Sequence, residues 1–325
     1  MNAANAPHIP VMLDEVLDYL APAASRPGAI AVDATLGAGG HTEALLTAHP
    51  GLTVIGVDRD PTALELASKR LAGFGERFIP ARAVYDAIPE VLEDNGFDHL
   101  DAVLFDLGVS SMQLDQADRG FAYSQDARLD MRMNPDDRLT AEIVVNTYAP
   151  GDLVRILREY GEEKFATRVV SSIVKAREKA PITSSSELAD LVKDAIPAAA
   201  RRTGGNPAKR TFQALRIEVN GELDTWERAL PAALDVTAPG GRVVVLSYHS
   251  LEDRITKQEL ARRARSNSPA GLPVDLPGTE PTFRLLTKKA QQPTQTELDR
   301  NPRAAPARLR AAERIAPSTG AGGAP

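Results

Sequence analysis

The stretch Ala31-Val32-Asp33-Ala34-Thr35-Leu36-Gly37-Ala38-Gly39-Gly40-His41-Thr42 decides the fold of this chain. The apolar run 29–32 predicts a buried strand, and three glycines within four residues follow it before a helical pattern begins. A second apolar run, 52–57, predicts another strand that ends at Asp58, 21 positions after Gly37. Strand, glycine turn, helix, strand and terminal acid are typical of a nucleotide-cofactor site. Glycines admit a close ligand, and the acid accepts hydrogen bonds from ribose hydroxyls.

Two departures from the dinucleotide pattern narrow the choice of cofactor. Thr42 stands where a G-x-G-x-x-G motif has its last glycine, which dehydrogenases need for close packing of helix on strand. Asp33, at the end of the first strand, would turn a negative charge toward an incoming pyrophosphate. A carboxylate suits a cationic ligand better, and S-adenosylmethionine carries an ammonium and a sulfonium group. The turn therefore favours a methyl donor over NAD, with a structural glycine turn that binds no ligand as the remaining alternative.

Strands and helices alternate over the first third of the chain. Strands are predicted over 29–32, 52–57, 77–81 and 102–105, and helices over 41–48, 61–71 and 86–93. Such alternation predicts a parallel sheet with right-handed crossovers. Asp58 and Asp106 then lie at the carboxyl ends of strands, where open α/β sheets bind their ligands.

After Asp106 the pattern changes. Residues 113–207 show helical spacing without clear strands, and a capping box at Ser184–Glu187 predicts the start of one helix. The α/β pattern then returns, with one long apolar stripe along 212–230 that includes Trp226, a predicted core residue, and with a predicted strand at 242–246. From about Ser266 onward we expect a loop-rich segment, and residues 318–325 are expected to be disordered. The predicted fold is a doubly wound α/β sheet made of residues 1–112 and 208–325, with a helical domain, 113–207, inserted in it.

The segment Asp106-Leu107-Gly108-Val109-Ser110-Ser111 follows the fourth predicted strand and is the candidate catalytic turn. An exocyclic amine of a base is a weak nucleophile, because its lone pair is delocalised into the ring. Acceptors at the amine hydrogens, such as the Asp106 carboxylate, pull electron density onto the nitrogen, and methyl transfer then depends mainly on alignment. The alternative is that Asp106 only caps a turn.

Two histidines are further candidates. His41 opens a helix, where its ring can lie over a ligand, and His249, at the end of the strand 242–246, is a candidate substrate contact. A structural role is the alternative for each of them. No third nitrogen or carboxylate at suitable spacing accompanies them, so no metal site is expected.

Charge is distributed unevenly along the chain, whose formal net charge is −6. Residues 1–112 hold 6 basic and 16 acidic residues, a net of −10, whereas residues 208–325 hold 18 basic and 13 acidic residues, a net of +5. A basic loop at 201–210 and a basic run fit contact with nucleic-acid phosphates, with a solvated surface as the alternative. The run consists of Arg254, Lys257, Arg262, Arg263 and Arg265. The chain has no cysteine, no long apolar stretch and no secretion signal, so we expect a cytoplasmic protein that does not bind membranes.

Several separated segments together resemble one family, the bacterial ribosomal RNA small subunit methyltransferase H family, also called the MraW family. The matching segments extend over nearly the whole chain. They are His8–Glu15, Asp33–Thr42, Val57–Pro61, Leu104–Ser111, Gln113–Asp115, Arg119–Phe121, Leu129–Met133, Tyr160–Ala166, Arg210–Asn220, Pro239–Arg242, Ser247–Arg254, Asn301–Ala304 and Leu309–Arg310.

The resemblance implies a class I methyltransferase sheet of Rossmann-like topology and S-adenosylmethionine as the cofactor. It also implies that the inserted helical domain, 113–207, helps to recognise the RNA substrate. It implies methyl transfer to the N4 amine of a cytidine in the decoding region of 16S ribosomal RNA, within the small ribosomal subunit. The catalytic candidates are Asp106 and His249. The family's cofactor contacts fall on Gly39, Gly40, His41, Asp58, Tyr85, Asp106 and Gln113.

The family often has Phe at two positions where this chain has tyrosine. Stacking of Tyr85 on adenine is expected to survive this change, because the aromatic face is kept. Tyr248 is the second such position, and its additional hydroxyl is expected to affect the fine shape of the base pocket.

Two other functions stay open at this point. One is a small-molecule methyltransferase that uses the 95-residue insertion as a lid. The other is a non-catalytic RNA-binding factor for ribosome assembly that keeps the cofactor fold. The oligomeric state is open as well, and a homodimer is one alternative.

Overall fold

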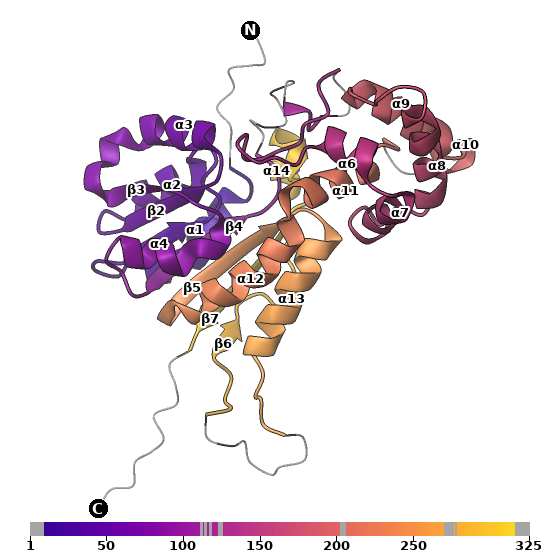
Figure 1. Ribbon diagram of the computed structural model, residues 1–325. Coiled ribbons are helices and arrows are strands. Elements are labelled where there is room, and N and C mark those ends of the chain that lie inside the picture. Colours follow the sequence, from indigo (N-terminus) through magenta and orange to yellow (C-terminus); the bar gives the residue numbers. More distant parts are fainter. Residues whose placement is uncertain are drawn as a thin grey trace, which may run out of the picture. The chain divides into compact units, whose positions relative to one another are not determined.

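The computed structural model describes residues 10–110, 113, 116, 119–122, 126–201, 206–269, 276 and 278–315. The chain divides into two compact units (Figure 1). We call Met1–Gly108 with Thr225–Pro325 the sheet unit, and Val109–Asp224 the helical unit. Some predictions fall outside the described residues: the His8–Ile9 part of the family motif, Ser111 at the end of the candidate catalytic turn, positions 114–115 of a family segment, the centre of the basic loop at 202–205, and disorder at 318–325.

A seven-stranded sheet is the centre of the sheet unit. Its strand order is β3-β2-β1-β4-β5-β7-β6. Neighbours among β1 to β5 are parallel, whereas β7 is antiparallel to both β5 and β6. The strands are β1 (Ile30–Asp33), β2 (Thr53–Asp58), β3 (Phe78–Arg82), β4 (Leu100–Asp106), β5 (Thr237–Ser247), β6 (Phe283–Leu285) and β7 (Arg308–Arg314). This order confirms the predicted doubly wound, Rossmann-like sheet of the class I methyltransferase type.

Helices cover both faces of the sheet, because both faces of its strands are apolar. On one face, Val54 and Leu104 pack in a core with α1 (Leu13–Ala24), α2 (Gly40–Ala48) and α3 (Pro61–Leu71). On the other face, Ile55 and Val103 pack with α4 (Ile88–Asp94), α12 (Glu222–Asp235) and α13 (Ser250–Arg263). Trp226 of α12 lies in this second core, as predicted, and donates a hydrogen bond from Nε1 to Thr256 Oγ1 at 3.2 Å.

The C-terminal part contains more regular structure than expected. Beyond Ser266, a segment predicted to be loop-rich, the described residues include β6, β7 and α14 (Gln295–Arg300), none of which was predicted. β7 pairs with β5, with Leu309 opposite Leu246, and completes the core with small side chains such as Ala311 and Ala312. The low hydrophobicity of these alanines hid the strand from the sequence pattern.

The helical unit has its own apolar core, which includes Leu153, Ile173 and Leu215. Its helices are α6 (Ala141–Thr147), α7 (Pro150–Glu159), α8 (Ala166–Arg177), α9 (Ser185–Ala195), α10 (Ala198–Arg201) and α11 (Lys209–Asn220). Ser184 caps α9 by accepting a hydrogen bond from the Glu187 N–H at 3.1 Å, as the predicted capping box requires. No helix in the described ranges combines the length and the apolar character needed to cross a membrane.

The unit boundary on the C-terminal side differs from the predicted position at residue 208. α11 packs into the helical core through Phe212 and Leu215, so it belongs to the helical unit. The apolar stripe along 212–230 is therefore divided between two helices. Gly221, with a φ of 59°, ends α11 in the left-handed conformation that glycine adopts easily. The substrate-recognition role of the helical unit stays a prediction.

Candidate functional site at the carboxyl ends of the strands

The glycine turn joins β1 to α2. Gly37 and Gly39 have φ angles of 51° and 77°, a left-handed backbone conformation in which most other residues are strained. Gly39 is the N-cap of α2 and supplies no side-chain cap, so the N–H groups of the first helical turn have no side-chain acceptor there. A Cβ at Gly40 would lie 2.6 Å from Cγ of Pro10. The packing of the chain before α1 therefore requires Gly40, independently of any ligand.

Asp33 and Thr42 explain the missing third glycine. Asp33 is buried at the end of β1, and its Oδ2 accepts a hydrogen bond from Thr42 Oγ1 at 2.7 Å. Its Oδ1 accepts a weaker bond from the Thr35 N–H at 3.3 Å. Burial raises the pKa of Asp33, and the bond from Thr42 opposes part of that rise. Thr42 thus replaces the glycine of a dinucleotide motif with a donor that stabilises a buried carboxylate.

Asp58 connects the end of β2 to the glycine turn. Its Oδ2 accepts from the Gly37 N–H and its Oδ1 from the Asp60 N–H, both at 2.9 Å. Burial raises the pKa of Asp58 to about 6, although both backbone hydrogen bonds act in the opposite direction. Each carboxylate oxygen has accepted one hydrogen bond and keeps capacity for a second, so the pair can receive two adjacent ribose hydroxyls.

Tyr85 lies just after β3, in the short 3-10 helix Tyr85–Ala87. Its ring meets Phe105 and Trp226 edge to face, with centroids 6.1 Å and 6.2 Å away. The guanidinium of Arg59 lies 5.9 Å from the centre of the Tyr85 ring. Two aromatic neighbours therefore fix the plane of Tyr85, as a stacking platform requires; its contact with adenine stays a prediction.

Asp106 ends β4, where three side chains surround it. Its N–H donates to Thr35 Oγ1 at 2.7 Å, and its Oδ1 accepts from the Tyr248 hydroxyl at 2.6 Å. Its Oδ2 lies 3.7 Å from Nδ1 of His41. The Asp106 side chain is 25% exposed, against 7% for His41, so the carboxylate rather than the ring is open to a substrate. Burial of the surrounding site raises the pKa of Asp106, while His41 and the Tyr248 hydroxyl lower it.

His249 is the N-cap of α13. Its Nδ1 accepts from the Glu252 N–H at 3.4 Å, while a Glu252 oxygen accepts from the His249 N–H at 3.2 Å. Its Nε2 lies 3.0 Å from Oε1 of the same glutamate, and the side chain is 8% exposed. These contacts give His249 a structural task at the start of α13, and its catalytic task stays a prediction.

The structure brings most of the predicted site residues together through these contacts. Residues that share the carboxyl edge of β1, β2 and β4 are Asp33, Gly37, Gly39, Gly40, His41, Asp58 and Asp106. Gln113 belongs to the helical unit, where its Oε1 accepts from the Ser110 N–H at 3.1 Å. Its contact with a cofactor stays a prediction.

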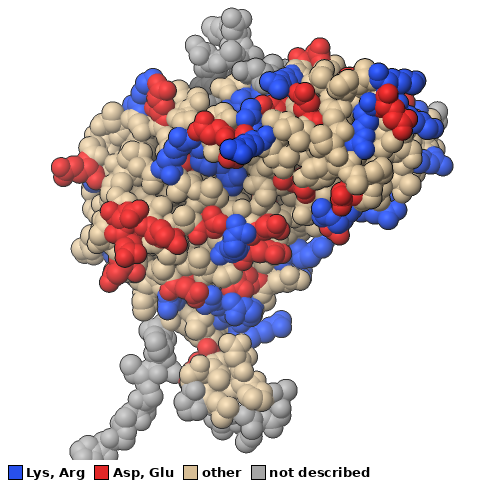
Figure 2. All heavy atoms as spheres, viewed as in Figure 1, with Lys and Arg blue, Asp and Glu red and all other residues tan. Residues whose placement is uncertain are grey.

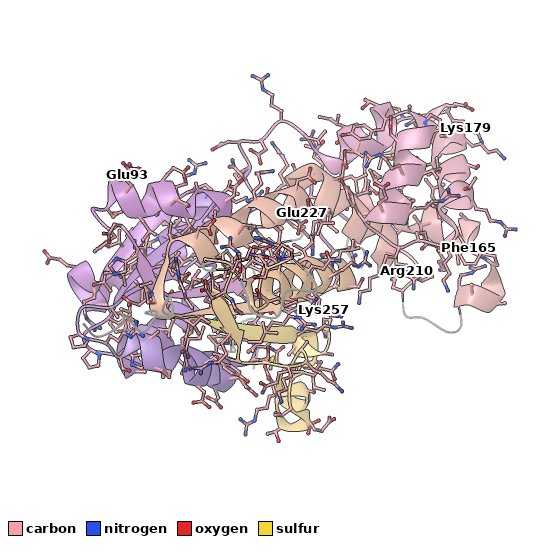
Figure 3. The ribbon with its side chains drawn as sticks, turned by 90° about the horizontal axis from the view of Figure 1, so that it is seen from below. Glu93, Phe165, Lys179, Arg210, Glu227 and Lys257 are labelled. Carbon is pink, nitrogen blue, oxygen red and sulfur yellow. The ribbon has the colours of Figure 1, made fainter. Side chains whose placement is uncertain are left out.

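Two of the five residues in the predicted basic run are held by acidic partners. Arg262 and Arg263 both pair with Glu259, and Arg263 also pairs with Asp235, at distances of 2.6 to 3.0 Å. Figure 2 shows blue and red atoms intermixed over α12 and α13 in this view, whereas red atoms gather over α4. Lys257 is exposed on α13 (Figure 3). Arg262 and Arg263 are therefore poor candidates for phosphate contacts, because acidic partners already hold them.

Sequence reasoning missed a second basic group at the carboxyl edge of the sheet. Arg308 begins β7 opposite Ser247, so it lies at the strand ends that carry Tyr248. Arg310 holds Asp253 through bonds of 2.7 Å and 3.2 Å, whereas Arg308 is 3.4 Å from the same carboxylate and 44% exposed. The alternation Arg308-Leu309-Arg310 is the only local signal, since a strand exposes every second residue.

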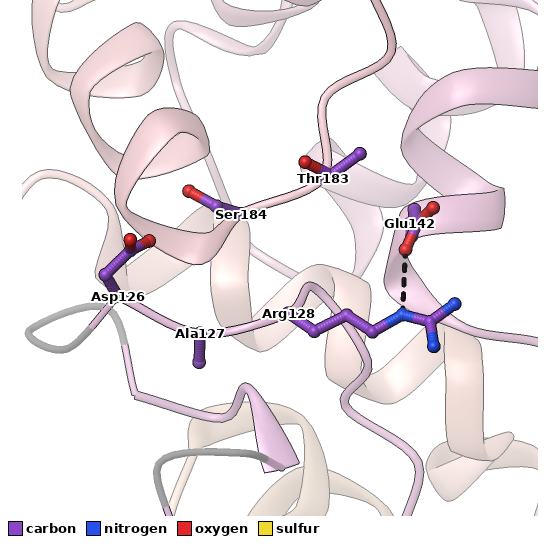
Figure 4. A pocket seen from close by; sticks show the side chains of 6 residues that line it. All are labelled: Asp126, Ala127, Arg128, Glu142, Thr183 and Ser184. Carbon is purple, nitrogen blue, oxygen red and sulfur yellow. Dashed lines mark hydrogen bonds and ion pairs between the residues drawn. The ribbon is translucent and has the colours of Figure 1, made fainter.

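Each of the two units has a surface pocket. One, in the helical unit, is lined by polar side chains, and an Arg128–Glu142 ion pair of 3.1 Å closes one side (Figure 4). The other lies between α1 and α2 and touches the predicted site only at Gly40. Over the described ranges, no group of three or more acidic or histidine side chains is arranged to hold a metal ion.

Known proteins resemble this chain over nearly its whole length. Residues 5–315 match the MraW methylase family. Two relatives named ribosomal RNA small subunit methyltransferase H come from Thermobifida fusca and Salinispora tropica. The first is 61% identical over 94% of this chain and 93% of its own, and the second is 59% identical over 98% and 87%. A solved rRNA methylase structure from Streptococcus thermophilus aligns over 95% of this chain and 99% of its own, at 14% identity and a TM-score of 0.43. At that similarity, the fold is assigned from the strand order alone.

Proposed function

The chain belongs to the MraW methylase family, and on that premise we propose that it methylates the N4 amine of a cytidine in the decoding region of 16S ribosomal RNA, with S-adenosylmethionine as the methyl donor. One observation carries the proposal. The Asp106 carboxylate is held at a strand end with one oxygen bonded and the other open to a substrate. The names of the relatives support ribosomal RNA as the substrate, and the cytidine and its N4 position are our inference.

The sheet edge suits the proposed cofactor. When bound, S-adenosylmethionine supplies an electrophilic methyl group on a sulfonium centre. Asp58 would accept the ribose hydroxyls with the lone pairs that Gly37 and Asp60 leave free. The first turn of α2, from Gly40 and His41, would donate main-chain hydrogen bonds, and Tyr85 would stack on the adenine. Asp33 adds negative charge beside a cationic ligand, which favours this donor over a dinucleotide.

Asp106 would act on the base that receives the methyl group. An acceptor oxygen at one amine hydrogen orients the nitrogen lone pair and increases its electron density, and alignment of nucleophile and methyl group provides most of the remaining acceleration. The amine nitrogen forms a bond to the methyl carbon as the carbon–sulfur bond breaks, and one amine proton then leaves to water. A base in structured RNA has to be exposed or flipped to reach this carboxylate.

We assign RNA recognition to the helical unit and to Arg308 at the edge of the sheet. Shape and phosphates dominate recognition of structured RNA, so an exposed guanidinium beside the catalytic strand ends is well suited. The substrate would be met in the cytoplasm, as RNA or as an assembled small subunit.

Mass spectrometry of small-subunit RNA tests the proposal. RNA from cells that lack this protein should lose one N4-methylcytidine, and expression of the wild-type chain should restore it. The Asp106→Asn variant should restore at least about a hundredfold less N4-methylcytidine per molecule of enzyme, because it replaces the charged hydrogen-bond acceptor. Unchanged N4-methylcytidine in cells without the protein would contradict the proposal.

Assays of the purified chain distinguish the two alternatives. Methylation of a free metabolite by the purified chain, with none of ribosomal RNA, would favour a small-molecule methyltransferase. RNA binding without any methyl transfer in the presence of the cofactor would favour an assembly factor.

A further inference from the structure

The hydroxyl of Tyr248 makes a direct contact with the proposed catalytic carboxylate. It donates a hydrogen bond to Asp106 Oδ1 at 2.6 Å, across 142 positions of sequence. The contact follows from the sheet, because Asp106 at the end of β4 is paired with Leu246 of β5, two positions before Tyr248. A phenylalanine here would pack in the same place and would leave Oδ1 without this donor.

Tyr248 is itself fixed in place. Its N–H donates to Glu252 Oε2 at 2.7 Å, and the same glutamate takes part in the capping box of α13. Its ring lies against Gly108, where a Cβ would come within 3.5 Å of Tyr248 Cδ2. The start of α13 and the turn after β4 therefore both hold the ring, so the hydroxyl points to one place.

The remaining surroundings of Asp106 leave one oxygen available. His41 Nε2 lies 3.0 Å from the Val11 carbonyl, which only accepts, so Nε2 carries a hydrogen and Nδ1 faces Oδ2. At 3.7 Å this approach is longer than a hydrogen bond. Among the described residues, no donor makes a hydrogen bond to Oδ2.

We propose that Tyr248 is a positioning residue for Asp106: its hydroxyl fixes Oδ1 and presents Oδ2 as the acceptor that the exocyclic amine of the base meets. A carboxylate rotates between two nearly equivalent states when neither oxygen is held. With Oδ1 occupied, the amine always meets the same oxygen in the same orientation. This inference rests on the proposed function, because it assigns the amine as the partner of Oδ2.

The contact also lowers the pKa of Asp106. The titratable groups that face this carboxylate are His41 on α2, Tyr248 after β5, Asp33 on β1 and Glu252 on α13. His41 and the Tyr248 hydroxyl lower the pKa of Asp106, whereas burial, Asp33 and Glu252 raise it. Removal of the hydroxyl should therefore raise the pKa and reduce the ionised fraction at the acidic side of the working range.

The test compares Tyr248→Phe with Tyr19→Phe in the full chain. Tyr19 is a matched control, because its hydroxyl also donates to a side-chain oxygen of the sheet unit, Gln291 Oε1 at 3.1 Å. Tyr248→Phe should lower kcat for methylation of small-subunit RNA about tenfold and leave KM for S-adenosylmethionine unchanged, since a hydrogen bond to a charged group is removed. The acid limb of its kcat–pH profile should move to higher pH. Tyr19→Phe should change neither kcat nor the position of the acid limb.

A second measurement does not depend on activity. Carbon NMR of aspartate-labelled protein, with the Asp106 signal assigned from Asp106→Asn, follows the carboxyl titration directly. Asp106 should titrate at higher pH in Tyr248→Phe than in the wild type. An unmoved titration in the folded variant overturns the positioning role, and so does an unchanged kcat with an unmoved acid limb. A wild type that titrates as expected but methylates no ribosomal RNA refutes the proposed function and, with it, the assignment of the amine.

Discussion

Affinity for S-adenosylmethionine should depend on pH through Asp58. Burial raises the pKa of this carboxyl group from 3.8 to about 6 in the protein without ligand. The ribose hydroxyls need ionised oxygens as acceptors, and protonation converts one of them into a donor. As the pH falls through 6, the competent form is lost and binding weakens. A carboxyl group whose pKa is lowered would stay ionised over this range and would give no such pH dependence.

The size of the effect follows from the pKa. If only the ionised form binds, the apparent Kd is the intrinsic Kd divided by the ionised fraction. With a pKa of about 6 that fraction is about 0.9 at pH 7 and about 0.1 at pH 5, so the Kd should rise about tenfold between them. Binding at pH 6 should release about half a proton, because half of the Asp58 side chains are protonated before the ligand arrives.

Isothermal titration calorimetry measures both quantities, the Kd from pH 5 to 7 and the proton release from buffers of different ionisation enthalpy. Asp58→Ala removes two charge-assisted acceptors, worth about 3 kcal/mol together, and should raise the Kd at pH 7 about a hundredfold. Any pH dependence of the Kd that remains in Asp58→Ala comes from the other carboxyl groups. Asp98→Ala is the control, because it removes an exposed carboxylate before the amino end of β4. A Kd that stays constant from pH 7 to 5, or an unchanged affinity in Asp58→Ala, would refute the ribose assignment.

Three further predictions test the surroundings of the site. Thr42→Val should lower the free energy of unfolding by about 2 kcal/mol in urea titrations, because it removes the hydroxyl that donates to the buried Asp33 carboxylate. Thr47→Val is the control, because the Thr47 hydroxyl bonds an exposed carbonyl, and it should change this free energy by less than about 0.5 kcal/mol. Equal effects of the two variants would contradict the reasoning. Arg308→Gln should reduce the slope of log affinity for small-subunit RNA against log salt by about 0.7 to 0.9, and Arg284→Gln, on β6, should leave it unchanged. Asn220→Ala removes buried bonds to the Met131 carbonyl and the Met133 N–H, so hydrogen exchange at 131–133 should accelerate at least about tenfold; unchanged protection there would count against this role.

The parts of the fold that are encoded locally were predictable. The strands β1, β2 and β4, the glycine turn and the cap of α9 follow from periodicity and from residue types within a few positions. α1 was not predicted, because its N-cap, Met12, has no capping side chain and Pro22 lies inside the helix. β7 escaped because alanines fill its core positions, and an alanine-rich strand has no strong hydrophobic signal.

Much of the candidate site depends on contacts that no local pattern encodes. Asp58 and the glycine turn were expected to meet because a short βαβ unit brings them together. The Tyr248–Asp106 bond joins residues 142 positions apart, and the Asp253–Arg310 pair joins residues 57 apart. Such pairs are set by strand order, so their partners become visible only once the sheet is assembled. The pairing of Arg263 with Asp235 likewise depends on how α12 packs beside α13.

The three carboxylates of the sheet edge together explain the choice of cofactor. Asp33, Asp58 and Asp106 end the neighbouring strands β1, β2 and β4, and burial raises the pKa of each. The charge of Asp33 further raises the pKa of the other two, so the ionised site is under mutual repulsion without a ligand. A pyrophosphate would add to this repulsion, whereas a ligand that carries ammonium and sulfonium charges relieves it. Replacing the last glycine of a dinucleotide turn by Thr42 fits the same logic, because its hydroxyl opposes the rise that burial causes in the pKa of Asp33, where a glycine offers no donor.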